Sequence, residues 1–434
     1  MFRRIAFALF DWGQHAYWVL VTTFIFTPYF AAGFVGDAAR GQALLGFGGA
    51  VAGVFAAFCS VFAGAGVDAW GRQRRWLLLL SIPFVAACCG LWIAAPGKGE
   101  LILPVVALMI VANVTAEVTA AVANTLLPVF AKPGGVGKLS GLSAGAGYIG
   151  GLVALLLVLF AFALPAHPLL GLDKALHEPD RIVGPLAAVW FLAFGLPLLI
   201  VAPDGPGRAG SRGALTELWA LVKTLPSRPT MLRFMVGRML VGDGVTAIVT
   251  FGGVLAAGMF HWTTIQLGIY GILMAGCAGV GAAVGGFLDD ALGPRRTVLI
   301  SVAVLLVGAV GLASVGPDRL LFLIPVVPPP EGAGLFGGAG ERTFLAFSTG
   351  IGLAYGPVQA AMRSWMARLA PPEETGRWFG LYALSGKATT FLAPLLIGVA
   401  TAATLQQKAA IPVIALFLAA GALAFARVSD RPAA

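Results

Sequence analysis

Long apolar runs, separated by short stretches of glycine, proline and charged residues, make up most of this chain of 434 residues. A run of about 20 apolar residues is long enough to cross a membrane as an α-helix. On this criterion the chain predicts twelve spans, at about residues 8–34, 42–65, 76–95, 101–127, 140–164, 183–202, 231–260, 265–288, 297–316, 342–368, 376–402 and 409–427. The expected fold class is therefore an all-α polytopic membrane protein with 12 transmembrane helices.

Two similar stretches each connect one span to the next, and they lie half the chain apart. GAGVDAWGRQRR runs from Gly64 to Arg75, and GFLDDALGPRR runs from Gly286 to Arg296. A repeat of half the chain length is typical of transporters built from two related helical bundles. It predicts two pseudo-symmetric six-helix bundles, at 1–203 and 231–434, joined by a cytoplasmic linker at 204–230.

Two features are expected at the membrane surface. Within the linker, Leu215, Leu218, Trp219 and Val222 recur at helical spacing beside basic residues. This pattern predicts an amphipathic helix that lies on the inner surface of the membrane and connects the bundles. Five aromatic residues either line a cavity or belong to the interfacial belt that is common near span ends: Trp12, Tyr17, Tyr148, Tyr355 and Trp378. For Trp378 the belt is favoured.

The composition indicates a membrane protein and argues against a nucleic-acid partner. Hydrophobic residues make up 59% of the chain and charged residues 11%, whereas a soluble domain carries roughly 25% charged residues. The net charge of +9 is spread over short links and is not collected on one face. Its distribution follows the positive-inside rule when both termini are cytoplasmic, which predicts a protein of the inner membrane.

The sequence has no motif of a soluble enzyme. It contains no P-loop, no paired Cys-x-x-Cys and no nucleophile elbow. Its four cysteines lie in apolar runs without the spacing of a metal site. We therefore expect no cofactor, no metal and no enzymatic activity. Transport by this protein would therefore run down the solute's own concentration gradient or be coupled to an ion gradient.

Six charged residues fall inside the predicted spans. They are Asp11, Glu117, Arg238, Asp243, Arg363 and Lys387. Each costs roughly 2.5–3.5 kcal/mol at a helix centre unless it faces a cavity or a partner. Counting from the span ends places Glu117, Asp243 and Lys387 near mid-membrane, and Asp243-Gly244 is expected to break or bend its helix. The alternative is that these charges form buried pairs that fix helix register without contacting a solute.

Uncharged polar residues complete the predicted pathway for substrate and protons. His15 lies one helical turn beyond Asp11, and it either carries a proton at physiological pH or lines the cavity as a hydrogen-bonded residue. Asn113 falls on the same helical stripe as Glu117, and it either contacts solute or bonds to a neighbouring helix. The pathway set is completed by these residues: His15, Asn113, Asn124 and Gln359.

The repeated motif predicts a cytoplasmic gate. Its residues are Gly64, Asp68, Gly71 and Arg72 in the first copy, and Gly286, Asp290, Gly293 and Arg296 in the second. Each Asp comes at the cytoplasmic end of a span. A charge-assisted pair with the arginine of its own motif, or with a neighbouring span, could hold the cytoplasmic side closed. The glycines let the chain turn sharply and let the helices approach closely. Solvated charges that serve only topology are the alternative.

Twelve spans, a six-plus-six repeat and the paired motif resemble the major facilitator superfamily over essentially the whole chain. Four further stretches resemble the bacterial relatives of the yeast vacuolar amino-acid effluxer, a branch whose substrates are mostly undefined. They are FDWGQHAYWVLVTTFIFTPYF at 10–30, ANTLLPVF at 123–130, SGLSAGAGYIGG at 140–151, and GPVQAAMRSWMARLAPPEETGRWFGLYALSGKATTFLAPLL at 356–396. This resemblance implies that the first, fourth, seventh and tenth spans line a cavity, and that the chain resides in a bacterial inner membrane.

Together these observations predict a secondary active transporter that works by rocker-switch alternating access. Mixed charge in the spans suits a small polar or zwitterionic solute, such as an amino acid, with proton or ion coupling. The expected partners are this small molecule, the coupling ion and the lipid bilayer, with the protein as a monomer. One alternative is an exporter of amphipathic or drug-like compounds. Another is a lipid-moving or scaffolding membrane protein.

Overall fold

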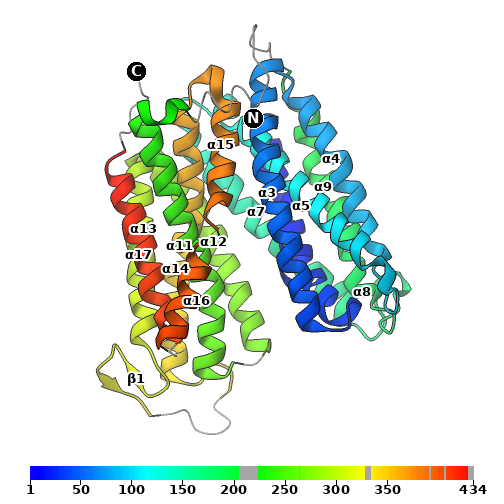
Figure 1. Ribbon diagram of the computed structural model, residues 1–434, viewed down its shortest axis with the longest axis vertical. Coiled ribbons are helices and arrows are strands. Elements are labelled where there is room, and N and C mark those ends of the chain that lie inside the picture. The colour runs from blue at the N-terminus through cyan, green and yellow to red at the C-terminus, as the bar shows by residue number, and fades with distance from the viewer. Residues whose placement is uncertain (205–222, 263, 328–333, 391, 405–406, 429–434) are drawn as a thin grey trace. The chain divides into compact units, whose positions relative to one another are not determined.

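The computed structural model describes residues 1–204, 223–262, 264–327, 334–390, 392–404 and 407–428, and almost all of the elements in them are helices (Figure 1). The predicted amphipathic helix at 215–222 lies outside these residues. The prediction of an all-α polytopic fold is confirmed. Among the described residues, eight helices are long and apolar enough to cross a membrane, and the shorter Ala410–Ala426 is also apolar.

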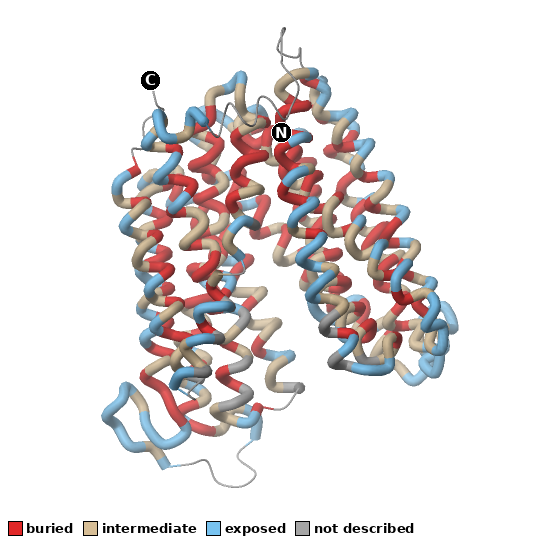
Figure 2. The backbone as a smooth tube through the Cα atoms, in the orientation of Figure 1, coloured by how far each residue is buried: buried red, intermediate tan, exposed pale blue. Residues whose placement is uncertain are grey.

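The helices pack into two compact units, each with a buried core of its own (Figure 2). Unit 1 comprises Met1–Pro133, Ala146–Lys223 and Ala370–Leu384. Unit 2 comprises Gly134–Gly145, Thr224–Leu369 and Ser385–Ala434. Each unit therefore includes a short segment from the other half of the sequence. The two predicted bundles and their linker remain a prediction.

The first half of the chain forms the helices that the apolar pattern predicts, with irregular segments in the first and fifth spans. The α-helices are α1 (Phe2–Ala16), α2 (Phe26–Tyr29), α3 (Ala38–Trp70), α4 (Gln73–Gly90), α5 (Ile102–Asn124), α6 (Leu127–Phe130), α7 (Val136–Val158), α8 (Glu178–Arg181) and α9 (Val183–Val201). The π-helical segments are Tyr17–Phe24, Phe30–Phe34 and Leu159–Ala163, and short 3-10 turns are Leu91–Ile93, Gly99–Leu101 and Leu169–Gly171.

The second half adds long helices and one small hairpin. The helices are α11 (Pro229–Phe260), α12 (Thr264–Leu292), α13 (Pro294–Ser314), α14 (Ala339–Leu369), α15 (Thr375–Ala388), α16 (Leu392–Thr404) and α17 (Ala410–Ala426), with 3-10 turns at Leu225–Ser227, Pro372–Glu374 and Gln407–Ala409. The strands β1 (Arg319–Leu320) and β2 (Ile324–Pro325) pair antiparallel, with Arg319 opposite Pro325. The eleventh predicted span is thus divided between α15 and α16.

Small residues let helix backbones approach closely inside each unit. In unit 1 a Cβ atom on Gly13 of α1 would lie 3.2 Å from the backbone nitrogen of Gly195 on α9. In unit 2 a Cβ atom on Gly356 of α14 would meet the backbone of Ala278 on α12. Because lipid supplies no hydrophobic force between helices, such close contact is a main source of helix association in membranes.

Candidate functional site

The first span of unit 1 is an irregular helix at the point where it faces α5. Its α-helical part ends at Ala16, and Tyr17–Phe24 continues as a π-helix. Ile25 then leaves the helical region, with φ −121° and ψ −66°. π-Helical segments are rare and often occur at functional sites. This one brings Tyr17 against the polar stripe of α5.

Tyr17, Asn113 and Glu117 form a polar cluster inside unit 1. The buried Tyr17 hydroxyl shares a hydrogen bond with the Asn113 side chain, and Glu117 acts on it electrostatically. Gln14, which is also buried, donates its Nε2 hydrogen to the backbone carbonyl of Ala116 at 2.6 Å. The structure therefore brings together Asn113 and Glu117, which share a helical stripe, with the candidate Tyr17, and it adds Gln14 from the first span. Asn124 is half-buried at the end of α5.

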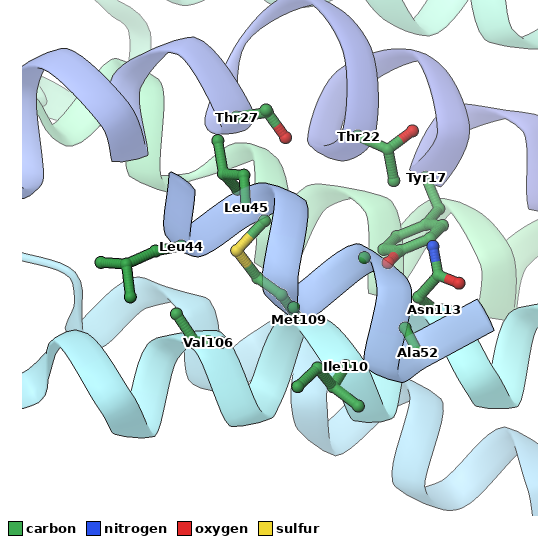
Figure 3. A pocket seen from close by; sticks show the side chains of 12 residues that line it. Tyr17, Thr22, Thr27, Leu44, Leu45, Ala52, Val106, Met109, Ile110 and Asn113 are labelled. Atoms are coloured by element: carbon green, nitrogen blue, oxygen red, sulfur yellow. The ribbon is translucent and has the colours of Figure 1, made fainter. Parts of the chain in front are cut away.

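A pocket with an open volume of about 590 Å³ lies beside this cluster (Figure 3). Tyr17, Thr22 and Thr27 line it from the first span. The remaining walls come from α3 and α5 and are mostly apolar, consisting of Leu44, Leu45, Gly48, Gly49, Ala52, Val106, Met109, Ile110 and Asn113. The pocket thus has an apolar body and a few polar groups, which is the usual character of a small-molecule site.

His15 and Asp11 lie on the same face of α1, as predicted, but their recorded contact involves the backbone. The Nδ1 atom of His15 is 2.8 Å from the backbone carbonyl oxygen of Asp11. Since a carbonyl only accepts, Nδ1 carries the hydrogen in this contact. The imidazole ring also packs edge-on against Tyr148, with 5.2 Å between ring centroids. Asp11 itself is buried, at 8% exposure.

Asp243 and Arg238 form a second charged cluster, inside unit 2. Both lie on α11, and the carboxyl group of Asp243 faces the hydroxyl of Thr389 and the guanidinium of Arg238. Arg238 Nη1 also donates to the hydroxyl of Ser385 at 3.4 Å. Within the described residues, the Oδ2 atom of Asp243 is buried without a hydrogen-bond partner. The charges of α11 are therefore placed against α15 and the turn that follows it.

The expected break at Asp243-Gly244 is wrong, because α11 continues as one helix from Pro229 to Phe260. Gly244 serves close packing instead of a bend. A Cβ atom there would lie 3.0 Å from the Leu418 side chain on α17. The interruption occurs in the facing span, where α15 ends at Ala388 and Thr389 forms a turn. A broken helix beside a membrane-embedded charge frees backbone groups that can bind a ligand.

Arg363 and Ser140 connect α14 to the start of α7 in unit 2. Arg363 donates from Nε to the Ser140 hydroxyl oxygen at 3.0 Å and from Nη2 to its backbone carbonyl at 2.5 Å. The Ser140 hydroxyl in turn donates to the carbonyl of Ala360 at 2.7 Å. Gln359 is half-buried one turn before Arg363 on α14. Lys387 belongs to α15, and its side chain lies outside the described residues.

The first copy of the repeated motif binds the start of α15. Asp68 accepts hydrogen bonds from the backbone N–H groups of Gly376 and Arg377, both at 2.7 Å. Its Oδ2 atom is also 3.7 Å from the Arg377 guanidinium. The first N–H groups of a helix have no partner within the helix, so Asp68 supplies the acceptors that α15 lacks. The predicted pairing of Asp68 with Arg72 is absent from the described residues, while the option of a neighbouring span agrees with the structure.

The second copy repeats this contact at the start of α7. Asp290 accepts hydrogen bonds from the N–H groups of Gly137 and Lys138, at 2.8 and 2.9 Å. It also forms an ion pair with Arg368 at 2.9 Å. In the part of the chain that the structure describes, Arg296 is not its partner. The two motifs therefore act alike, because each places a carboxylate at the N-terminus of a helix that is distant from it in the sequence.

The motif glycines have the two roles expected of them. Gly71 and Gly293 adopt positive φ angles of 61° and 87°, which L-residues with side chains rarely adopt. Gly64 lies against the backbone carbonyl of Gly376. Gly286 lies in the same way against the backbone of Gly141 on α7. These close approaches bring each Asp within hydrogen-bond distance of its helix terminus.

A comparison with known families identifies the chain. The family model described as "Vacuole effluxer Atg22 like" matches residues 136–433. The chain belongs to this family. The match covers the second copy of the motif and the long stretch from 356 to 396 on which the resemblance in the sequence rests.

Individual relatives of this Atg22-like protein are distant. It is 25% identical to autophagy-related protein 22 of Botryotinia fuckeliana over 260 residues, which cover 56% of this chain and 42% of the relative. It is 24% identical to autophagy-related protein 22-2 of Neosartorya fischeri over 302 residues, which cover 65% of this chain and 47% of that relative. The chain thus spans about half the length of the curated relatives that it matches.

Solved structures share the fold. The proton:xylose symporter XylE has a TM-score of 0.71 at 13% identity, covering 99% of this chain and 96% of the symporter. The transporter FucP in its outward conformation has a TM-score of 0.71 at 13% identity, covering 99% of this chain and 98% of that transporter. A bacterial homologue of the iron transporter ferroportin gives 0.68 at 13% identity, with 99% of each chain covered. The Atg22-like chain therefore has the fold of the major facilitator superfamily.

Sequence reasoning missed several residues of these clusters in the Atg22-like protein. Asp289 is 1% exposed, forms an ion pair with Arg368 at 3.0 Å and accepts a hydrogen bond from Ser364. The doubled Asp of the second motif is a signal that could have indicated it. Trp378 was expected at the membrane surface, but it is fully buried and donates to Glu374 at 3.2 Å.

Proposed function

We propose that this Atg22-like protein is a secondary active transporter of a small polar or zwitterionic solute, with amino acids as the solute class. The observation that supports this most directly is the cluster in unit 2. There Asp243 and Arg238 lie within a membrane span, beside the turn that separates α15 from α16. A charge inside a membrane is costly and is typical of a solute or ion pathway.

Opposite charges and hydrogen-bonding groups match the two ends of a zwitterion. The Arg238 guanidinium can hold a carboxylate, and the Asp243 Oδ2 atom, buried without a described partner, can accept from an ammonium group. In unit 1 Glu117 and the Tyr17–Asn113 pair offer a second acid with polar neighbours. A solute with both charges is therefore a better match than a purely apolar compound.

The pocket of unit 1 is a candidate solute site of its own, with Glu117 and the Tyr17–Asn113 pair as its polar neighbours. Its walls of aliphatic side chains and Met109 match an apolar group, and Asn113 and Tyr17 stand at one end (Figure 3). A Cβ atom on Gly49 would meet nothing within 4 Å, so the pocket has room at that wall. We infer that amino acids with large apolar side chains are preferred.

Coupling to protons follows from the same acids. Acidic residues inside membrane spans commonly form the proton relays of pumps and transporters. Asp243 and Glu117 are therefore the proposed coupling residues, and the transport cycle is proposed to be rocker-switch alternating access. On the distribution of Lys and Arg between links, we propose that both termini are cytoplasmic. On the resemblance to bacterial members of the family, we propose that the protein resides in an inner membrane and acts as a monomer.

Counterflow in proteoliposomes tests the solute class. Wild-type protein loaded with a mixture of unlabelled amino acids should take up labelled leucine or methionine faster than labelled aspartate or lysine. Gly49→Leu, which fills the pocket, should reduce leucine uptake several-fold and leave alanine uptake less affected. Gly46→Leu is the matched control, because Gly46 also has open space at its Cβ position but does not line the pocket.

The alternatives give different results in the same assay. Counterflow of amphipathic dyes but no amino acid would support an exporter of drug-like compounds, which the apolar pocket walls would also suit. No counterflow of any solute by monodisperse, folded wild-type protein would contradict the proposal and favour a lipid-moving or scaffolding protein.

A further inference from the structure

Unit 2 has an apolar groove that the proposed transport function does not use. It lies between α12, α13 and α14 and has an open volume of about 690 Å³. Its walls are exposed apolar side chains, among them Val284, Ile300 and Val304 at 53%, 50% and 40% exposure. Because α12 and α13 are both long and apolar enough to cross a membrane, we take these exposed walls to face the hydrocarbon of the bilayer.

The floor of the groove offers an occupant only apolar contact. Gly285 of α12 lies against Pro357 of α14, where a Cβ atom would be 2.5 Å from the proline ring. The two hydroxyls of the lining are already used, since Ser301 donates to the carbonyl of Thr297 at 2.8 Å and Thr297 donates to that of Gly293 at 3.0 Å. An alkyl chain is therefore the chemistry that matches this groove.

An uncommitted arginine stands at one end of the groove. Arg296 precedes the lining residue Thr297 and lies one helical turn before Ile300, on the same side of α13. It is exposed and makes no ion pair within the described residues, where Asp290 is instead bound by Arg368. A guanidinium at the end of a membrane span is a strong partner for a phosphate group.

We propose that the groove and Arg296 together form a binding site for an anionic glycerophospholipid of the bilayer. The phosphate group binds Arg296, and an acyl chain lies along α13 between α12 and α14. The lining from Thr297 to Val304 extends about 10 Å along the helix, which is about a third of the hydrocarbon thickness of a bilayer. The site therefore holds the part of one acyl chain that is nearest the headgroup, in the leaflet where α13 begins.

Native mass spectrometry of the detergent-purified protein tests this site. The probes are palmitoyl-oleoyl-phosphatidylglycerol (POPG) and its neutral phosphatidylcholine counterpart (POPC), each titrated to give the apparent Kd of the first bound lipid. Wild-type protein should bind POPG about fivefold more tightly than POPC, the factor that one basic side chain at a membrane surface provides. Arg296→Gln should raise the apparent Kd for POPG to that for POPC and leave the apparent Kd for POPC unchanged.

Arg74→Gln is the matched control, because Arg74 is the exposed arginine at the equivalent position of the first motif copy. It should leave the POPG preference intact. Val304→Trp and Ala354→Leu fill the groove from two different helices. Both should weaken the binding of POPG and of POPC. Dihexanoyl-phosphatidylglycerol, whose short chains leave most of the groove empty, should bind the wild type several-fold more weakly than POPG.

Three results would overturn the proposal. The first is an unchanged POPG preference in Arg296→Gln. The second is an equal loss in Arg74→Gln, which would indicate a general effect of surface charge. The third is wild-type binding of dihexanoyl-phosphatidylglycerol that is as tight as that of POPG, which would exclude the groove without relying on any variant.

Discussion

Removing the carboxylate of Asp68 should release the start of α15 from unit 1. Asp68 accepts backbone hydrogen bonds from Gly376 and Arg377 at 2.7 Å each, and its side chain is only 7% exposed. Asp68→Asn keeps the size of the side chain but replaces one acceptor oxygen with an NH₂ group, which donates. One of the two N–H groups then faces a donor and has no acceptor.

The expected cost follows from these contacts. A hydrogen bond to a charged group contributes about 1.5–3 kcal/mol, and a negative charge at a helix N-terminus adds about 0.3–1 kcal/mol. The sum, about 2–4 kcal/mol, is little reduced by solvent because the carboxylate is buried. Since 1.4 kcal/mol corresponds to a factor of ten, local opening at this helix start should become at least about 30-fold more frequent.

Hydrogen exchange of a peptide that covers residues 370–384 measures this opening. Asp68→Asn should accelerate exchange of its first amides by at least about 30-fold, while peptides of α17 keep their wild-type rates. Arg72→Gln is the matched control, because Arg72 has no ion pair with Asp68 in the described structure. Unchanged hydrogen-exchange rates of these amides in Asp68→Asn, or an equal acceleration in Arg72→Gln, would refute the reasoning.

Two further substitutions test contacts inside the units. Ser140→Ala removes the hydroxyl that accepts from Arg363 Nε at 3.0 Å, while the bond from Nη2 to the Ser140 carbonyl remains. Loss of this hydrogen bond to a charged group should lower the free energy of unfolding by about 1–3 kcal/mol, and an unchanged thermal midpoint in detergent would contradict this. Gly64→Ala places a methyl group against the carbonyl of Gly376 and should cost about 1–3 kcal/mol by overpacking. Gly49→Ala meets open space, so its thermal midpoint should match the wild type.

The spans and the fold class could be predicted from the sequence because the membrane makes hydropathy decisive. The interruptions of helices could not. Asp243-Gly244 contains the residue type expected at a break, yet Gly244 lies inside the continuous helix α11, where it packs against Leu418 of α17. The actual turn lies in the facing span at Thr389, and Ile25 gives no sign in the sequence of leaving the helix.

The polar candidates were predicted better than their partners. Asp68 and Asp290 stand out because their spacing is repeated, but what they bind is backbone N–H, a group that every residue except proline carries. Arg72 and Arg296 were favoured only because they are close in sequence. Trp378 was assigned to the membrane surface from its position near a span end, whereas tertiary packing buries it completely.

The central claim, that charges within the spans couple a solute to protons, is tested most directly by amino-acid uptake into proteoliposomes under an imposed pH gradient. Wild-type protein should accumulate the labelled amino acid that it exchanges in counterflow, and dissipating the gradient should abolish accumulation. Asp243→Asn or Glu117→Gln should abolish gradient-driven accumulation in a folded protein, while Asp180→Asn, at an acid bonded to His177 outside this cluster, should not. Wild-type accumulation that persists unchanged in both Asp243→Asn and Glu117→Gln would contradict the account.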